Sequence, residues 1–295
     1  MKTKIVFDCE TGDPDDMLTL LMLCDHPRVD LQAVTVTPGS KAQIGLVRHL
    51  LRLMGKDVPV GAFNIDHPKE CVSAWHYTAF GTIDPSEEAE EGWQVLLNNC
   101  GPDVTLLTGA ALKNLGARLK WADTAAEDEP RWRFERWVAQ GGFAGEGVVP
   151  SLYQLEKFKG LRTCPTYNFN GDPKAALAAL KVKDRFGERL LVSKNVCHGV
   201  KMGADLLART RAAAESTKRR SLELVAQHCP DGKALHDPLA MTCAIDQAVG
   251  TWSYPITMFR EKGEWGCIEA APTKSDTRIT INYERSVFEN VLLEG

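Results

Sequence analysis

Short apolar stretches alternate with helical patterns along the first sixty residues of the chain. Strands are predicted at residues 4–7 and 31–37 and from residue 58 onward, and helices at residues 17–24 and 42–54. Because parallel strands need a crossover connection, this order predicts an α/β fold with a doubly wound, mostly parallel central sheet and helices on both faces. We expect residues 1–295 to form one domain, since no polar stretch is long enough to mark a boundary.

The loop after the first predicted strand is unusually acidic. It carries five carboxylates within nine residues: Asp8, Glu10, Asp13, Asp15 and Asp16. Open α/β sheets bind ligands beyond the carboxyl ends of their strands. Crowded acids repel one another, and a bound cation would relieve that repulsion; oxygen ligands suit Ca²⁺ or Mg²⁺. The alternative is a helix N-terminus whose dipole attracts acids, but five acids exceed what a dipole stabilises.

A second polar pair, His236-Asp237, precedes an apolar segment at residues 241–245. Asp237 could complete the shell of a cation, and His236 could act near a leaving group as an acid or a hydrogen-bond donor. Taken alone, the pair is more typical of an Asp that caps a helix beside a partly buried His.

Composition narrows the class of protein. A formal net charge of −4 argues against a protein that coats a nucleic-acid polymer. No apolar run approaches the length of a membrane span, and the first residues lack the apolar region of a secretion signal. The nine cysteines are scattered without a CxxC pair, which favours reduced thiols. We therefore expect a cytoplasmic protein without a membrane partner.

Seven segments carry motifs that follow one another in a recognisable order. They are the acidic loop with Asp8-x-Glu10 and Asp15-Asp16, and residues 29–37, 106–115, 167–173, 192–198, 236–240 and 273–281. In this order they resemble the motifs of the calcium-dependent, inosine–uridine-preferring nucleoside hydrolases. Residues 236–240, His-Asp-Pro-Leu-Ala, match that family's motif without change. The sequence is thus identified as a divergent member of the family.

The resemblance implies a reaction. Such enzymes hydrolyse the N-glycosidic bond of a nucleoside to free base and sugar, with a Ca²⁺-activated water and an oxocarbenium-like transition state. The resemblance also implies a small-molecule nucleoside as the binding partner, and assembly into a homodimer or homotetramer.

The resemblance further assigns roles to individual residues. The cation would be held by Glu10, Asp16, the backbone carbonyl of Thr108, and Asp237. Glu10 would also take a proton from the attacking water, and His236 would assist the leaving base. Asp15 and Asn168 would hold the sugar hydroxyls.

Several positions depart from the family pattern. Glu10 stands where the family has Asp, and the acidic loop is one residue longer, so Asp13 could share the role of base. Substrate contacts are also expected to differ. Ser40 and Thr166 replace an Asn and a Glu of the family, and Glu146 lies near the position of another expected Asn.

Trp75 and His76 fall in the region that closes over the base in this family. Aromatic rings there could stack on a nucleobase. They could equally pack this segment onto the protein core.

An additional segment at residues 151–165 contains Lys157, Lys159 and Arg162. Because basic side chains pair with phosphate, the substrate could carry a 5′-phosphate or another enlarged 5′ group. The alternative is a surface insertion with ordinary solvated lysines.

Two further classes of function compete with hydrolysis of a nucleoside. The altered sugar contacts are compatible with a non-catalytic protein that binds Ca²⁺ and a nucleoside. Asp8-x-Glu10-Thr11 after a strand also resembles, more weakly, the loop of haloacid-dehalogenase-like phosphatases, which leaves Asp15 and Asp16 unexplained.

Overall fold

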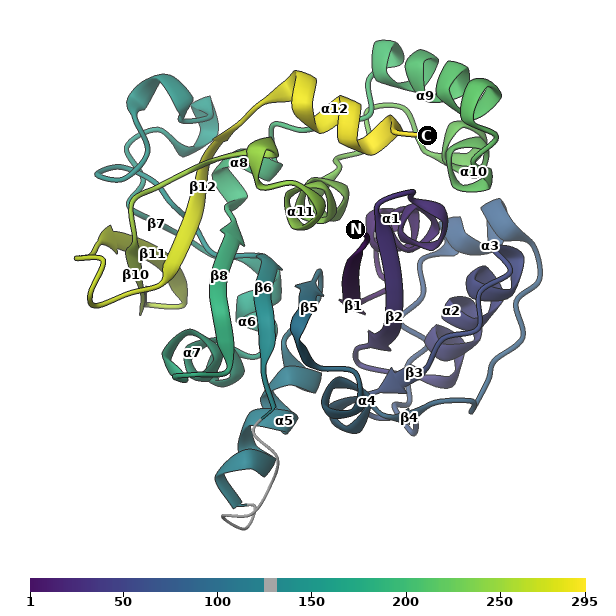
Figure 1. Ribbon diagram of the computed structural model, residues 1–295, viewed down its shortest axis with the longest axis horizontal. Coiled ribbons are helices and arrows are strands. Elements are labelled where there is room, and N and C mark those ends of the chain that lie inside the picture. Colours follow the sequence, from purple (N-terminus) through teal and green to yellow (C-terminus); the bar gives the residue numbers. More distant parts are fainter. Residues whose placement is uncertain (125–131) are drawn as a thin grey trace.

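The computed structural model describes residues 1–124 and 132–295. Within this part of the chain, a nine-stranded sheet has the order β4-β3-β2-β1-β5-β6-β8-β12-β9 (Figure 1). Its strands are β1 (Thr3–Cys9), β2 (Val29–Val36), β3 (Val60–Ala62), β4 (Glu90–Glu91), β5 (Gly101–Thr108), β6 (Phe134–Gln140), β8 (Phe186–Val192), β9 (Gly250–Trp252) and β12 (Thr277–Tyr283). Neighbours pair in parallel except β12 and β9, which are antiparallel.

A small antiparallel sheet lies at one end of the molecule. It is formed by β10 (Ile256–Glu261), β11 (Glu264–Glu269) and β7 (Thr163–Cys164), in the order β10-β11-β7. In Figure 1 this sheet lies beside β12, far from β3 and β4.

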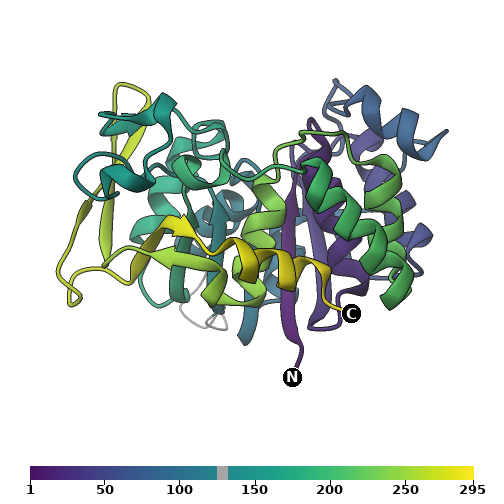
Figure 2. The same cartoon turned by 90° about the horizontal axis from the view of Figure 1, so that it is seen from above.

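Helices cover both faces of the central sheet. They are α1 (Pro14–Asp25), α2 (Lys41–Leu53), α3 (Ala74–Phe80), α4 (Gly92–Asn98), α5 (Lys113–Thr124), α6 (Tyr167–Gly171), α7 (Pro173–Lys181), α8 (Lys194–Cys197), α9 (Ala204–Thr217), α10 (Arg220–His228), α11 (His236–Ile245) and α12 (Arg285–Leu293). Buried side chains of α1, α2, α10, α11 and α12 form one apolar core, and those of α4, α5 and α7 form a second. Figure 2 shows the C-terminal helix α12 running along one face of the sheet. The predicted doubly wound fold is therefore confirmed.

Burial on both faces explains the apolar character of the first strand. Ile5 and Phe7 belong to one core and Val6 to the other, because successive side chains of a strand point to opposite faces. Asp8 is the next residue in this alternation, so its side chain points to the same face as Val6. No helix in the described part of the chain is long and apolar enough to cross a membrane.

The strand order positions a ligand site. From β1 the chain passes outward to β2 and β3, then returns to β5 on the other side of β1 and continues to β6 and β8. The direction of winding thus reverses between β1 and β5, and open α/β sheets bind ligands beyond the carboxyl ends of such strands. Helix α1 begins shortly after β1, and α11 packs against α1, β5 and β6. The N-terminal ends of α1 and α11, both of which carry acidic residues, therefore lie together at this edge of the sheet.

Candidate functional site

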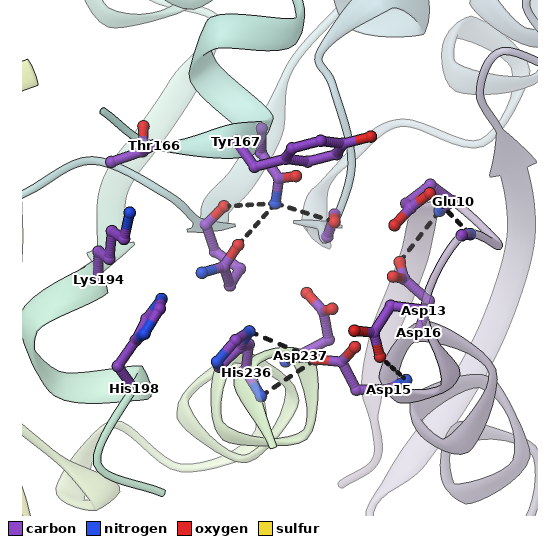
Figure 3. A pocket seen from close by; sticks show the side chains of 14 residues that line it. Glu10, Asp13, Asp15, Asp16, Thr166, Tyr167, Lys194, His198, His236 and Asp237 are labelled. Carbon is purple, nitrogen blue, oxygen red and sulfur yellow. Dashed lines mark hydrogen bonds and ion pairs between the residues drawn. The ribbon is translucent and has the colours of Figure 1, made fainter. Parts of the chain in front are cut away.

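A cavity of about 440 Å³ opens at the carboxyl ends of β1, β5 and β6. One side of the cavity is acidic, and the other carries lysine and histidine (Figure 3). The acidic side is lined by Glu10, Asp13, Asp15, Asp16 and Asp237. The opposite side is lined by Thr166, Lys194 and His198, with His236 and Asn168 between the acids and the basic groups.

Three buried carboxylates converge at the floor of the cavity. Oxygens of Asp15, Asp16 and Asp237 lie within 4.8 Å of one another, although Asp237 is far from the other two in sequence. Backbone amides fix their orientation. Asp15 accepts hydrogen bonds from the amides of His236 and Asp237, at 3.1 and 3.3 Å, and Asp16 accepts one from the amide of Glu10 at 3.0 Å.

This cluster has the properties of a cation site. Burial, and then the charges of neighbouring carboxylates, raise the pKa of Asp16 and of Asp237 well above the usual range. Oδ1 of Asp237 is buried without a hydrogen-bond partner among the described residues. A Cβ at Gly109 would approach that oxygen to 2.5 Å and Oδ1 of Asp16 to 2.9 Å, so the backbone of Gly109 lies against both acids. Oxygen donors alone suit a hard divalent cation.

The two candidate bases, Glu10 and Asp13, have different hydrogen-bond and ion-pair partners. Glu10 accepts a hydrogen bond from the amide of Gly12 at 2.8 Å, and burial raises its pKa. Asp13 caps α1 and forms a 2.6 Å ion pair with Lys233. Burial opposes ionisation of Asp13, but hydrogen bonds with Asp15 and Lys233 outweigh it and lower the pKa of Asp13. The carboxylate of Glu10 therefore binds a proton more readily than that of Asp13.

His236 is held between the acids and a second histidine. Its ring stacks on that of His198, with centroids 4.7 Å apart, and its Nδ1 lies 3.8 Å from Asp15. Burial, followed by the charge of Lys233, lowers the pKa of His236 to about 4. Its Nε2 is buried without a hydrogen-bond partner among the described residues. At neutral pH the ring is uncharged and can donate one hydrogen bond.

A second group of possible metal ligands is less suitable. Cys197, His198 and His236 bring their ligand atoms within 4.8 Å of one another. However, the two rings are stacked at 20°, so their nitrogen lone pairs lie in nearly parallel planes and do not converge on one ion. Lys157 also lies 2.7 Å from His198 and would repel a cation.

Asn168 and Thr108 are oriented by contacts with the protein core. Nδ2 of Asn168 donates to the carbonyl oxygens of Gly109 at 2.9 Å and Gln140 at 3.0 Å, which leaves its Oδ1 to accept from a ligand. The hydroxyl of Thr108 accepts a 3.0 Å hydrogen bond from the indole of Trp137. The side chain of Thr108 is thus committed to the core, and its backbone is the part that could contact an ion.

Two residues expected to contact substrate do not line the cavity. Ser40 caps α2 through a reciprocal pair of hydrogen bonds with Gln43, and its hydroxyl donates to the carbonyl of Glu70 at 2.5 Å. Glu146 borders a separate cavity together with Arg162. The expected substrate contacts of Ser40 and Glu146 are thus replaced by a helix cap and by a different surface.

Trp75 and His76 also lie away from the cavity. The indole of Trp75 donates to the carbonyl of His228 at 3.2 Å, and its ring packs edge-on against His76. His76 is fully buried, and its Nε2 contacts the carbonyl of Thr11 at 3.1 Å. The second interpretation of these rings, packing onto the core, agrees with their position.

Several residues that border the site received no role from sequence, among them Lys194, His198, Lys233 and Tyr167. Lys194 begins α8 one residue after β8 ends, and Lys233 lies in the polar loop before α11. Their positions next to these elements could have indicated that both lie near the site. The exposed ring of Tyr167 extends over the cavity toward Glu10 in Figure 3.

Asp8, counted among the acids of the loop, lies outside the cavity. One oxygen accepts from the hydroxyl of Thr35 at 2.6 Å and from the amide of Asn114 at 2.8 Å, while the other is buried without a partner among the described residues. Burial raises the pKa of Asp8 to about 6. Ionisation of Asp8 therefore costs folding free energy.

Replacing Asp8 with Asn is expected to stabilise the protein at pH 8. The folded-state pKa of Asp8 exceeds its ordinary value of 3.8, so stability is complete below that value and declines as pH rises through about 6. Asn cannot ionise, so it removes the cost of about 3 kcal/mol of folding free energy that ionised Asp8 carries at pH 8. Its Oδ1 can still accept the hydrogen bonds from Thr35 and Asn114. Urea unfolding at pH 4 and pH 8 measures the effect, with the exposed Asp57→Asn as control. If Asp8→Asn changed the free energy of unfolding equally at pH 4 and pH 8, this expectation would be contradicted.

Comparison with known proteins gives a consistent result. A family model described as inosine-uridine preferring nucleoside hydrolase matches residues 5–286. An uncharacterized protein of Aquifex aeolicus is 28% identical over 295 residues, which cover 95% of each chain.

Solved structures share the fold. A plant nucleoside hydrolase superposes with a TM-score of 0.71 at 19% identity over 100% of both chains. A purine-preferring ribonucleoside hydrolase from Gardnerella vaginalis superposes with a TM-score of 0.67 at 17% identity, covering 98% of this chain and 96% of the other. An inosine-uridine preferring nucleoside hydrolase from Bacillus anthracis gives 0.67 at 16% identity, over 99% and 98%.

Proposed function

The chain belongs to the inosine-uridine preferring nucleoside hydrolase family, whose enzymes cleave N-glycosidic bonds, and we propose that it does so with a bound Ca²⁺. The observation that carries the proposal is the convergence of Asp15, Asp16 and Asp237 within 4.8 Å at the floor of the cavity. Ca²⁺ accepts many protein oxygens in flexible geometry, whereas Mg²⁺ prefers to keep several waters. Ligands from separate segments therefore favour Ca²⁺.

The proposed cation ligands are Glu10, Asp16, the backbone carbonyl of Thr108, and Asp237. When bound, Ca²⁺ would lower the pKa of a water molecule and would bind the sugar diol. The unpartnered oxygen of Asp237 and the close approach of Gly109 support this assignment.

The chain's own residues account for the remaining steps. Glu10 accepts a proton from the attacking water, since the carboxylate of Asp13 is already committed to a 2.6 Å ion pair with Lys233. Asp15 and Asn168 accept hydrogen bonds from sugar hydroxyls. His236 donates from its ring to the departing base. Dense negative charge around the sugar stabilises the positive charge that develops in the transition state.

A panel of nucleosides, incubated with and without a chelator, tests this function. We expect release of free base and sugar with Ca²⁺, loss of release with EGTA, and recovery on adding Ca²⁺ back. Binding of Ca²⁺ and nucleoside without release of base would instead indicate a non-catalytic protein. Release of inorganic phosphate from a phosphate ester, without free base, would indicate a phosphatase. Sedimentation of the purified protein tests the proposed homodimer or homotetramer.

A further inference from the structure

The cavity has a basic side that the proposed reaction does not use. Lys194 and His198 lie on the side away from Glu10 and Asp13 (Figure 3). The ammonium of Lys194 donates to the carbonyl of Pro165 at 2.7 Å, and that of Lys157 lies 2.7 Å from Nδ1 of His198. Within residues 1–124 and 132–295, neither lysine forms an ion pair with a carboxylate. Lys194 lines the cavity, and Lys157 contacts the cavity-lining His198, so both positive charges lie at this side without a carboxylate partner among the described residues.

The ammonium groups of Lys157 and Lys194 both lie near one buried aromatic ring. Residues 151–165 fold into short turns that bury Phe158 against Phe143. The ammonium groups of Lys157 and Lys194 lie 5.0 and 6.0 Å from the centre of the Phe158 ring, and His198 packs edge-on against the same ring. Lys157, Lys194 and His198 thus pack around one buried ring, with Lys157 exposed at its outer side.

His198 adds a neutral donor to this side. Burial, then the neighbouring His236 and Lys157, lower the pKa of His198 to about 3, so the ring is uncharged at neutral pH. Because the ammonium of Lys157 donates to Nδ1, the ring proton resides on Nε2. Two ammonium groups and one ring N–H are donors that match the oxygens of a phosphate.

We propose that Lys157, Lys194 and His198 bind a phosphate on the substrate, so that the preferred substrate is a ribonucleoside 5′-monophosphate. This inference rests on the proposed function, which places the sugar diol at the acids and the departing base at His236. The remaining substituent of the ribose ring is the 5′ group. Asn168 and Thr166 lie at the start of α6, and Lys194 is hydrogen-bonded to the residue before Thr166. The 5′ group would therefore extend from Asn168 toward Lys194.

The structure corrects which basic residues of the additional segment take part. Lys159 forms a 2.5 Å ion pair with Glu156 at the exposed surface, and Arg162 borders the separate cavity. Lys159 and Arg162 thus do not line the cavity, whereas Lys194, which lies outside this segment, does. Lys159→Gln is therefore a matched control for Lys157→Gln.

Turnover of a nucleoside and of its 5′-monophosphate, measured as kcat/KM with Ca²⁺, tests the inference. We expect the monophosphate to be preferred at least about 10-fold. Lys157→Gln and Lys194→Gln should each reduce that preference by up to about 10-fold, as loss of a charge-assisted hydrogen bond predicts. Lys159→Gln should leave both the preference and the basal activity unchanged. Equal kcat/KM for both substrates, insensitive to Lys157 and Lys194, would overturn the inference.

Binding measurements separate this inference from the proposed function. Calorimetry with ribose 5-phosphate and with ribose should show tighter binding of the phosphate, and Lys194→Gln should remove the difference. If base is released only from the nucleoside, and ribose and ribose 5-phosphate bind equally, the phosphate site is rejected but the proposed hydrolase function stands. Preference for orotidine, whose base is anionic, without preference for ribose 5-phosphate would overturn the 5′ assignment. Failure to release base from any substrate rejects the proposed function, and the calorimetry still tests the phosphate site.

Discussion

Asp16→Asn and Asp237→Asn are each expected to abolish Ca²⁺-dependent release of base. Each substitution keeps the volume of the side chain but removes a negative charge from a buried cluster whose oxygens lie within 4.8 Å of one another. We expect kcat/KM to fall by about 10³-fold or more, because both the activated water and the anchored diol depend on the cation. Titration with Ca²⁺, followed by calorimetry, should show that affinity is lost together with turnover.

The same variants should behave in the opposite way when the cation is removed. The folded-state pKa of both acids is raised, so in EGTA the stability that these two groups contribute is fully present below the ordinary value of 3.8 and is lost as pH rises through the raised values. The Asn variants lack this loss and should unfold at a higher temperature than the parent in EGTA at pH 8. Ca²⁺ should raise the unfolding temperature of the parent but hardly that of the variants.

The exposed acid Asp231 provides the control, since it lies in the loop before α11 but does not line the cavity. Asp231→Asn should keep both the turnover and the stabilisation by Ca²⁺. Full Ca²⁺-dependent turnover in either cluster variant would show that the cation binds elsewhere.

The convergence of the acids could be predicted only in part from topology. Parallel strands end at one edge of the sheet, which places the acidic loop after β1 there. Helix α11 follows α10 and not a strand, so the approach of Asp237 to this loop was indicated by the family resemblance. The same rule places Lys194, just after β8, at this edge of the sheet. It was overlooked because only acidic side chains were considered as candidates there. Asp8 was misplaced because the strand extends to Cys9, and alternation then turns Asp8 away from the cavity.

Ser40, Trp75 and His76 could not be placed from sequence because their roles depend on distant partners. Ser40 has the sequence signature of a helix cap with Gln43, yet a capping hydroxyl can also face a ligand. Trp75 and His76 are fixed by carbonyl groups at His228 and Thr11, which no local pattern indicates. Likewise, the ion pair of Asp13 with Lys233 links segments that are far apart in the chain, so no local pattern indicates it.

Glu10→Gln is expected to reduce kcat by about 10²- to 10⁴-fold while the protein still binds Ca²⁺. Gln keeps an oxygen for the cation and can accept the hydrogen bond that the amide of Gly12 donates to Glu10, but it cannot accept a proton from water. Ca²⁺ affinity should therefore fall much less than in Asp16→Asn.

Asp13→Asn is the informative comparison for Glu10→Gln, because Asp13 lines the same cavity and is the other candidate base. Asn caps helices about as well as Asp, so α1 should be retained. Since Asp13 is already paired with Lys233 and has a lowered pKa, we expect its loss to reduce kcat by less than about 10-fold. Single-turnover rates at saturating Ca²⁺ and substrate measure the chemical step in both variants. If Asp13→Asn lost more activity than Glu10→Gln, the proton would pass to Asp13, and the extra methylene of Glu10 would serve only to reach the cation.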